Sequence, residues 1–376
     1  MNRTGTVLLE FDPNLNQLRK DKKLWDGLSA VTQVGDTLWT ANDEALSLEQ
    51  LFRRDETSNG EIRYANHRQF PLSGFLELPA PPDADGKIEE ADIEGLDYNG
   101  GYLWLVGSHS LKRDKPKEEH SEEHSIEKNA ERLAKVSRDG NRFLLARIPL
   151  DPSTQSPKKT VEQNGHSRTA ARLAGNRKSN ALTRALAGDE HLGPFLAIPS
   201  KDNGFDIEGL AVVGDRVFVG LRGPVLRGWA VILELALKEQ DASTLTLKDI
   251  GPDGRPYRKH FLNLGGLGVR DLCAQGDDLL VLAGPTMTVA GPQKVFRWSG
   301  GARPPRESLV FGKDLPTVLE LPGGADSPAG QDQAEGITLF APTGGAARQI
   351  LVAHDSTAQG RRREPSTVEV DLFALP

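Results

Sequence analysis

Residues 206–223 read DIEGLAVVGDRVFVGLRG, and residues 92–109 read DIEGLDYNGGYLWLVGSH. Each stretch contains two short apolar segments separated by a turn that contains glycine. Glycine supplies the positive φ that a tight hairpin requires, so each stretch predicts a β-hairpin. Two near-copies of one hairpin indicate a repeat architecture, which has to be traced along the whole chain before any other interpretation.

Three further stretches follow the same pattern. They are GLSAVTQVGDTLWTAND at 27–43, GVRDLCAQGDDLLVLAG at 268–284, and a stretch at 333–355 that begins QAEGITLF and ends QILVAHD. In all five copies one residue occupies the place before the Gly-Leu step or its equivalent. We call these five residues the ring positions: Ser29, Glu94, Glu208, Arg270 and Glu335. The intervals between them are 65, 114, 62 and 65 residues, so three of the four are nearly equal, as repeated units require.

The spacing predicts an all-β fold of the β-propeller class. Two more strands follow most hairpins, and four strands in about 65 residues are typical of a propeller blade with long loops. After the last hairpin only one strand follows, STVEVDLFAL at 366–375, so the first strand, GTVLLEF at 5–11, is expected to complete that sheet and close the ring. We favour five blades, and a sixth, degenerate blade within 150–200 remains an alternative.

The long interval contains two insertions in what we expect to be a single domain over residues 1–376. Residues 111–131 are highly charged and predict an exposed loop or helix, in which His120 and His124 have a spacing that would suit a weak metal site. Residues 152–192 predict an irregular segment with one short helix at 179–192, capped by Ser179.

Composition restricts the classes of function. The chain has 46 basic and 53 acidic residues, a net charge of −7, which argues against nucleic-acid binding because that requires a basic face. It has one cysteine, Cys273, and neither a signal peptide nor an apolar run of the ~20 residues that span a membrane. We therefore expect a cytoplasmic monomer that contacts neither nucleic acid nor membrane.

Polar residues gather at one end of the predicted ring. The first strand of each hairpin starts, and the second strand ends, at the same face of a propeller, and we call this face the mouth of the channel. The starts contribute Ser29, Asp92, Glu94, Asp206, Glu208, Arg270, Asp271 and Glu335. The ends contribute Asn42, Asp43, Ser108, His109, Arg222, His354 and Asp355.

Crowded carboxylates must be protonated, paired with arginine or bridged by a cation, which leaves three interpretations. The first is structural: the acids cap backbone N–H groups and pair with Arg222 and Arg270. The second is a Ca²⁺ site, because hard oxygen ligands converge there. Its predicted ligands are Asp92, Glu94, Asp206, Glu208 and Glu335. The third is a pocket for a small anion or phosphate ester, with Arg222, Arg270, His109 and His354 facing the anion.

The segments DIEGLDYNGGYLWLVGSHS, KDNGFDIEGLAVVGDRVFVGLRGPVLRGWAVILEL and LGVRDLCAQGDDLLVLAGP resemble the bacterial family of domain of unknown function 3616. The resemblance extends from about Leu28 to Asp355 and implies no established activity. The Asp-x-Glu-Gly-Leu steps at 92–96 and 206–210 are also similar to phytase-like, or esterase-like, propellers, a resemblance that implies calcium and phosphate esters. Ser29 and Arg270 depart from that pattern.

Two functions follow. The first is a propeller that binds a small anionic ligand or a protein partner at the mouth, as an adaptor in a bacterial multi-protein system, with 111–131 as a docking element. The predicted ligand-binding residues are Asp43, Glu94, Glu208, Arg222, Arg270, Asp271 and Asp355. The alternative is a calcium-dependent phosphoric-ester hydrolase that uses His109 or His354 as its base.

Overall fold

The five repeated hairpins are present in the structure. The computed structural model describes residues 3–20, 22–54, 61–86, 88–117, 125–287, 289, 291–322, 331–342, 345–363 and 365–375. The hairpins are β4 (Leu28–Val34) with β5 (Thr37–Asn42), β8 (Ile93–Asn99) with β9 (Tyr102–Gly107), β18 (Asp206–Val213) with β19 (Arg216–Gly223), β23 (Gly268–Gln275) with β24 (Asp278–Gly284), and β28 (Gln333–Phe340) with β29 (Gln349–Asp355).

Further antiparallel strands extend each hairpin outward. These strands are β6 (Ser47–Arg54) and β7 (Ile62–Pro71), β12 (Leu145–Pro149) and β15 (Ala171–Leu173), β20 (Trp229–Glu239) and β22 (Arg258–Asn263), β25 (Gln293–Trp298) and β27 (Thr317–Leu321), and β31 (Thr367–Ala374) and β1 (Arg3–Glu10). Parallel pairs connect outer strands of neighbouring units: β1 with β7, and β15 with β21 (Thr244–Leu247), which also pairs with β20. The remaining short strand beside β22 is β26 (Ser308–Val310), which pairs with it in parallel.

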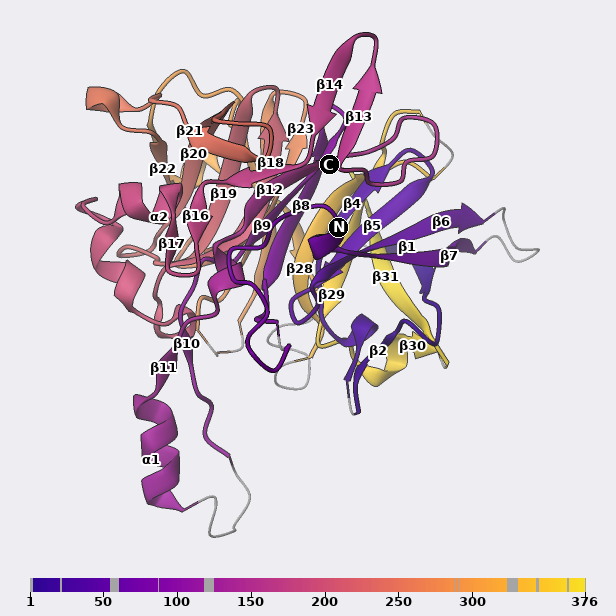
Figure 1. Cartoon of the computed structure of the whole chain (residues 1–376), viewed down its shortest axis with the longest axis horizontal. Helices are drawn as coiled ribbons and strands as arrows, with labels where there is room; N and C mark the ends of the chain where they lie inside the picture. The colour runs from indigo at the N-terminus through magenta and orange to yellow at the C-terminus, as the bar shows by residue number, and fades with distance from the viewer. Residues whose placement is uncertain are drawn as a thin grey trace.

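The first strands of the five hairpins form a ring. β4 contacts β8, β8 contacts β18, β18 contacts β23, β23 contacts β28, and β28 contacts β4. Figure 1 shows the resulting arrangement, with the sheets fanning outward from the first strands. The all-β fold is a β-propeller, as the repeated hairpin predicted.

The predicted closure by the two terminal strands is also present. β1 pairs antiparallel with β31 over seven residue pairs, from Arg3↔Phe373 to Glu10↔Thr367. Since β31 in turn pairs with β29, the first strand of the chain becomes the outermost antiparallel strand of the sheet that the last hairpin begins. An unpaired edge on β31 is thereby removed.

Five clusters of buried apolar side chains lie between neighbouring units, one at each interface. The cluster between the second and third units illustrates the arrangement, because Trp104 and Leu145 of one sheet pack with Val219 and Leu233 of the next. Burial of apolar area at about 25 cal/mol per Å² is the main stabilising contribution at such interfaces. The core is therefore distributed around the ring, and each unit depends on both of its neighbours.

Glycine allows the first strands to approach one another closely. A Cβ at Gly95 would lie 2.6 Å from the Leu210 Cβ of the next unit. Gly209 and Gly336 occupy equivalent places: a Cβ at Gly209 would lie 3.1 Å from the Asp271 backbone, and one at Gly336 would lie 3.1 Å from the backbone nitrogen of Val31. The glycine of the Glu-Gly-Leu step is thus required by the next backbone.

The described residues of the two predicted insertions lie outside the ring of first strands, but β15 within 152–192 is an outer strand of the second hairpin's sheet. The described residues between 112 and 137 form a projecting arm, as Figure 1 shows, in which β10 (Lys112–Arg113) pairs with β11 (Val136–Ser137) and α1 (Ile126–Ala134) precedes β11. His120 and His124 lie outside the described residues. Beyond residue 152 come a projecting hairpin, β13 (Thr160–Gln163) with β14 (His166–Thr169), and a short pair, β16 (Gly175–Asn176) with β17 (Ser179–Asn180).

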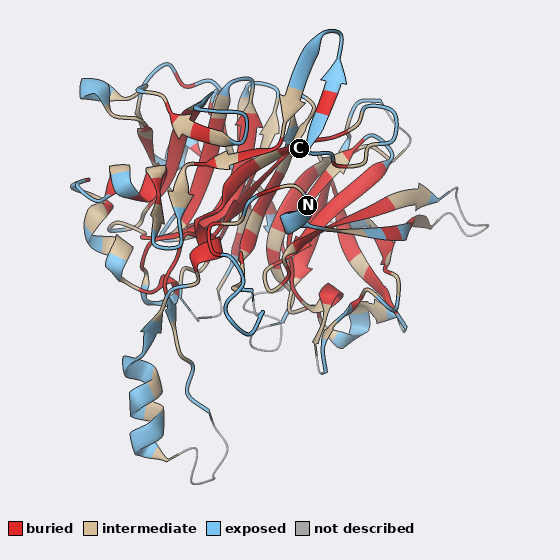
Figure 2. Ribbon diagram, viewed as in Figure 1, coloured by how far each residue is buried: buried red, intermediate tan, exposed pale blue. Residues whose placement is uncertain are grey.

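The predicted helix at 179–192 is shorter than expected. α2 spans Ala181–Leu186, and Asn180 caps it in place of Ser179, accepting a hydrogen bond from the Thr183 backbone N–H. Figure 2 shows that α1 and the tips of β13 and β14 are largely exposed, whereas the ring strands are buried. Within the described residues no helix is long and apolar enough to cross a membrane.

The close approach at Gly95 can be tested by substitution. We expect Gly95→Ala to lower the free energy of unfolding by about 1–3 kcal/mol, because the added methyl overlaps the Leu210 Cβ in a packed core. Gly188→Ala is the matched control, since nothing lies within 4 Å of a Cβ there, and it should leave stability nearly unchanged. Urea denaturation measures both, and equal effects of the two substitutions would contradict the packing argument.

Candidate functional site

All five ring positions are the extra residue of a β-bulge. The register of each hairpin shifts between the residues that flank the ring position, for example between Ile93 and Gly95 and between Ile207 and Gly209. The same shift occurs at the other three. A bulge leaves its extra residue out of the ladder and redirects its side chain. The bulges thus explain how the ring side chains differ in direction from their strand neighbours.

A chain of ion pairs connects three ring positions. Arg270 lies between two carboxylates: its Nε is 3.0 Å from Glu208 Oε2, and its Nη2 pairs with Glu335 Oε1. Arg222, at the end of β19, continues the chain, with Nη1 2.6 Å from Glu208 Oε1 and Nη2 2.8 Å from Asp206 Oδ2. Buried ion pairs of this kind are costly to break singly, at about 3–5 kcal/mol. Arg222 and Arg270 are therefore committed to internal carboxylates.

A further arginine holds the acid at the start of the second unit. Arg142 Nη1 lies 2.6 Å from Asp92 Oδ2, and the same guanidinium donates to the Ser110 hydroxyl at 2.9 Å. Arg142 precedes β12, in a 3₁₀ turn at Gly140–Phe143. Sequence reasoning missed this residue because it lies outside the repeated hairpin and no motif marks it.

Three carboxyl groups at the mouth have no arginine or lysine ion pair within the described part of the chain: Asp43, Glu94 and Asp355. Burial, followed by the neighbouring carboxylates of Asp355 and Asp92, raises the pKa of Asp43 to about 7. Burial, followed by the charges of Asp92 and Glu208, raises the pKa of Glu94 well above its usual value. Negative charge is therefore in excess at the mouth.

The other predicted carboxylates of the mouth behave similarly. Burial raises the pKa of Glu335 well above its usual range, although Arg270 opposes the shift. Burial also raises the pKa of Asp206 to about 7, against the lowering effect of Arg222. A raised pKa means that a carboxyl group keeps its proton to a higher pH, whereas a bound cation favours the ionised form and so lowers that pKa. The mouth therefore becomes more negative as the pH rises through about 7, where Asp43 and Asp206 lose their protons.

Two of the predicted residues serve the strands rather than the mouth. Asp271 follows the ring position, and its Oδ2 accepts a hydrogen bond from the Ile337 backbone N–H of the next unit at 2.8 Å. The hydroxyl of Ser29, at the first ring position, donates to the Ile93 carbonyl oxygen at 2.5 Å. Both side chains thus join neighbouring first strands through these hydrogen bonds.

His109 is buried beside the mouth and both of its ring nitrogens are engaged. Nδ1 lies 2.7 Å from the Gly107 carbonyl oxygen, and Nε2 lies 2.6 Å from the Asn180 side-chain nitrogen. Nδ1 must therefore donate and Nε2 must accept, which is the neutral tautomer. Burial lowers the pKa of His109 to about 4, in agreement with that assignment.

His354 lies within its own sheet. Its Nε2 is 3.6 Å from Asp371 Oδ2 of β31, and Arg361 Nη2 donates to the same oxygen at 2.8 Å. Burial, followed by the charge of Arg361, lowers the pKa of His354 to about 4. The structure therefore does not gather His109, His354, Arg222 and Arg270 around one space.

The carboxylates predicted as calcium ligands are likewise divided among arginine partners. Asp92 pairs with Arg142, Asp206 with Arg222, and Glu335 with Arg270. Over the described residues no group of three or more His, Cys, Asp or Glu side chains has the geometry to hold a metal ion. Among the carboxylates at ring positions, Glu94 is the one that forms no ion pair with a described arginine.

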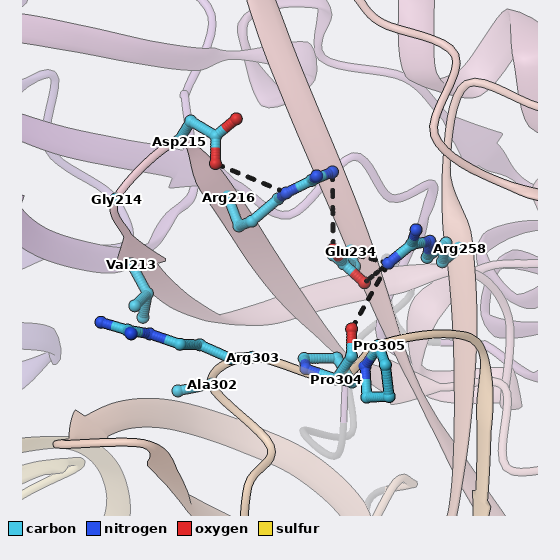
Figure 3. A pocket seen from close by; sticks show the side chains of 10 residues that line it. All are labelled: Val213, Gly214, Asp215, Arg216, Glu234, Arg258, Ala302, Arg303, Pro304 and Pro305. Carbon is cyan, nitrogen blue, oxygen red and sulfur yellow. Dashed lines mark hydrogen bonds and ion pairs between the residues drawn. The ribbon is translucent and has the colours of Figure 1, made fainter.

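A hollow of about 480 Å³ lies at the opposite end of the strands, beside the Gly214-Asp215 turn. Figure 3 shows that Arg216 and Arg258 both point toward the buried carboxylate of Glu234, at 3.6 and 3.5 Å. Arg258 also donates to the Pro304 carbonyl oxygen at 3.4 Å. The arginines of this hollow are therefore neutralised by the protein itself.

Comparison with known proteins places the chain in a family. Residues 27–371 match the family described as "Protein of unknown function (DUF3616)", and the chain belongs to it. No curated protein matches the chain. Among solved structures, a glutaminyl cyclase of Myxococcus xanthus is similar, with 10% identity, full coverage of both chains and a TM-score of 0.39. A putative oxidoreductase (glucose dehydrogenase) of Thermus thermophilus has 12% identity over 98% of this chain and 100% of its own, with a TM-score of 0.35.

The raised pKa of Asp43 predicts a pH-dependent stability. The folded carboxyl holds its proton up to about pH 7, whereas the unfolded one loses it near pH 4, so stability falls as pH rises through this window. Asp43→Asn should therefore raise the free energy of unfolding at pH 8 by about 1–3 kcal/mol, because it removes a charge that folding buries. Water that reaches the half-buried group screens part of this charge and limits the size of the effect.

Urea denaturation between pH 4 and 8 measures this difference. At pH 4 the two proteins should be equally stable, because the carboxyl is then protonated. The exposed Asp249→Asn is the control and should follow the parent at every pH. An Asp43→Asn protein with the parent's pH profile would contradict the raised pKa.

Proposed function

We propose that this chain is a binding module that takes up a positively charged ligand, or a positively charged group of a protein partner, at the mouth of the channel. The observation that carries the proposal is the set of three carboxyl groups, Asp43, Glu94 and Asp355, that have no arginine or lysine ion pair among the described residues. Crowded carboxylates without counter-charge are stabilised by a bound cation.

The charges of the mouth favour a cation over the anion that the arginines first suggested. Arg222 and Arg270 already contact Asp206, Glu208 and Glu335, and both histidines named with them are neutral at pH 7. An anion would have to displace internal carboxylates from buried arginines, which is costly. A cation would instead meet carboxyl groups that form no ion pair with a described arginine or lysine.

The mouth belongs to a ring that we propose has five blades. Each of the five hairpins starts one sheet, and the five first strands contact one another in cyclic order. Residues 150–200, the place considered for a sixth blade, contribute β15 to the sheet of the second hairpin and otherwise form small hairpins and α2. Five ring positions then surround one channel, with Glu94 beside the Glu208–Arg270–Glu335 chain.

A second candidate function, docking of a protein partner, is supported by a different feature, the projecting arm. The arm carries exposed apolar side chains: Ile126 is 85% exposed, Leu133 49% and Val136 42%. Figure 1 shows α1 standing away from the sheets. An amphipathic helix presented in this way is a common mode of recognition by a partner's groove. This role would suit an adaptor in a multi-protein system.

The alternative of a calcium-dependent phosphoric-ester hydrolase rests on the same carboxylates. Ca²⁺ prefers six to eight oxygen ligands, and the three unpaired carboxyl groups would supply part of such a set. The chemistry would also need a base at the mouth. Both ring nitrogens of His109 are already hydrogen-bonded, and His354 is buried within its own sheet, 3.6 Å from Asp371, so neither histidine favours this function over simple binding.

Titration calorimetry at pH 8 tests cation binding at the mouth. We expect the methyl ester of arginine to bind, with Ca²⁺ as the second probe, and Glu94→Gln to weaken binding at least tenfold, since the variant keeps the size of the side chain and removes its charge. The exposed Glu162→Gln is the matched control and should bind like the parent. Binding should also weaken below pH 7, where Asp43 is protonated.

The outcomes separate the candidates. Binding of Ca²⁺ justifies a panel of phosphate esters, and binding of the arginine ester alone points to a basic ligand or partner. Failure of both probes, or equal affinity of the parent and Glu94→Gln, would contradict a cation site at the mouth.

Substitutions in the arm should leave thermal stability unchanged and abolish the binding of a protein partner. Ile126→Ser combined with Leu133→Ser should leave the midpoint of thermal unfolding unchanged, because both side chains are exposed. The same variant should lose any partner that the parent protein retains from an extract. Replacing residues 114–135 with a short Gly-Ser linker should give the same loss while the β10–β11 pair is retained. Undiminished capture by either protein would remove the arm from the proposal.

A further inference from the structure

We propose that a pocket beside the mouth binds a small carboxylate carried on an aromatic or other apolar body. The pocket has a volume of about 190 Å³. It lies where the end of the second hairpin meets the segment around α2, and its apolar lining includes Leu111, Phe143, Ala187 and Leu196. His109 forms part of its wall. None of these residues belongs to the cation site proposed above.

The walls are mainly apolar and the rim is basic. Arg138, Lys178 and Arg184 line the opening, and all three are exposed to solvent. The lining also contains the hydroxyl-bearing Ser179 and Thr183 and no acidic residue. An apolar cavity with a few polar groups at its edge is typical of a small-molecule site.

The three rim cations are not neutralised by the described part of the chain. Arg138 Nη1 donates to the Lys178 carbonyl oxygen at 3.3 Å, and Arg184 donates to the carbonyl oxygens of Ser179 and Ala174 at 3.4 and 3.3 Å. These acceptors are neutral, and no described carboxylate forms an ion pair with any of the three. The acid next to Arg138, Asp139, instead pairs with Arg142.

The larger hollow of Figure 3 provides the contrast. There Arg216 and Arg258 face Glu234, so an entering anion would meet donors that are already occupied. In the pocket at the second unit the guanidinium groups keep unused donors, and the protein supplies no competing carboxylate. In a chain of net charge −7, three cations around one apolar opening attract an anion locally.

The ring of His109 indicates the kind of apolar body. It is neutral, because Nδ1 donates to Gly107 and Nε2 accepts from Asn180, so it adds an aromatic wall and no charge. It meets the ring of Phe143 nearly at right angles, with 6.0 Å between centroids. A third ring can pack favourably against such a pair. The volume is below the ~300 Å³ of common ligand pockets, which limits the body to about one ring.

Benzoate and benzamide are the probes, because they share a ring and differ in charge. We expect titration calorimetry at low salt to show at least fivefold tighter binding of benzoate than of benzamide. Lys178→Gln combined with Arg184→Gln should weaken benzoate binding at least tenfold and leave benzamide nearly unchanged. The exposed Lys158→Gln, which removes a cation far from the pocket lining, should bind both as the parent does.

A second variant separates shape from charge. Ala187→Leu fills the pocket without changing its charge, and it should weaken both probes at least fivefold. Glu94→Gln should leave benzoate binding unchanged, so the experiment tests this pocket separately from the cation site at the mouth. Benzoate that binds no better than benzamide, or that binds equally to the Lys178→Gln and Arg184→Gln protein, would overturn the proposal, as would the absence of binding.

Discussion

The close approach of neighbouring first strands around the axis is the constraint on which the rest of the structure depends. It requires glycine at 95, 209 and 336, where a Cβ would meet the next strand. It also coincides with the bulge that redirects the preceding side chain at each ring position. Carboxylates are thereby forced together in a confined space, and arginines or bound cations must offset them. Packing and chemistry at the mouth thus have one origin.

The same region separates charge of two signs. On one side the mouth carries carboxyl groups in excess, and on the other the pocket lined by His109 carries only cations. Two sets of contacts lie beside these regions: Arg142 with Asp92 and Ser110, and His109 with Asn180. Moving either set would break hydrogen bonds or ion pairs of buried groups, which is costly.

The hairpin copies, the terminal strand pairing and the convergence at the mouth could be predicted from the sequence, because turn glycines and repeat spacing are local signals. The direction of each side chain could not. A bulge adds one residue, so Glu208 faces the channel while Asp271, one place further along in its copy, bonds to the next strand. His354 and Asp355 are adjacent, yet only Asp355 lies at the mouth. No sequence motif marks the residues that come from outside the repeat, which are Arg142 and the rim residues Arg138, Lys178 and Arg184.

The pairing of β1 with β31 has a consequence for the order of synthesis and folding. Residues 3–10 are synthesised before the other strands of the ring, but their antiparallel partner at 367–374 is synthesised after them. Until then β1 has only its short parallel contact with β7, and the sheet of the last hairpin lacks its outer strands. Contacts of such long sequence separation slow folding and prolong the exposure of strand edges. The closing of this ring therefore joins its earliest synthesised strand to its latest.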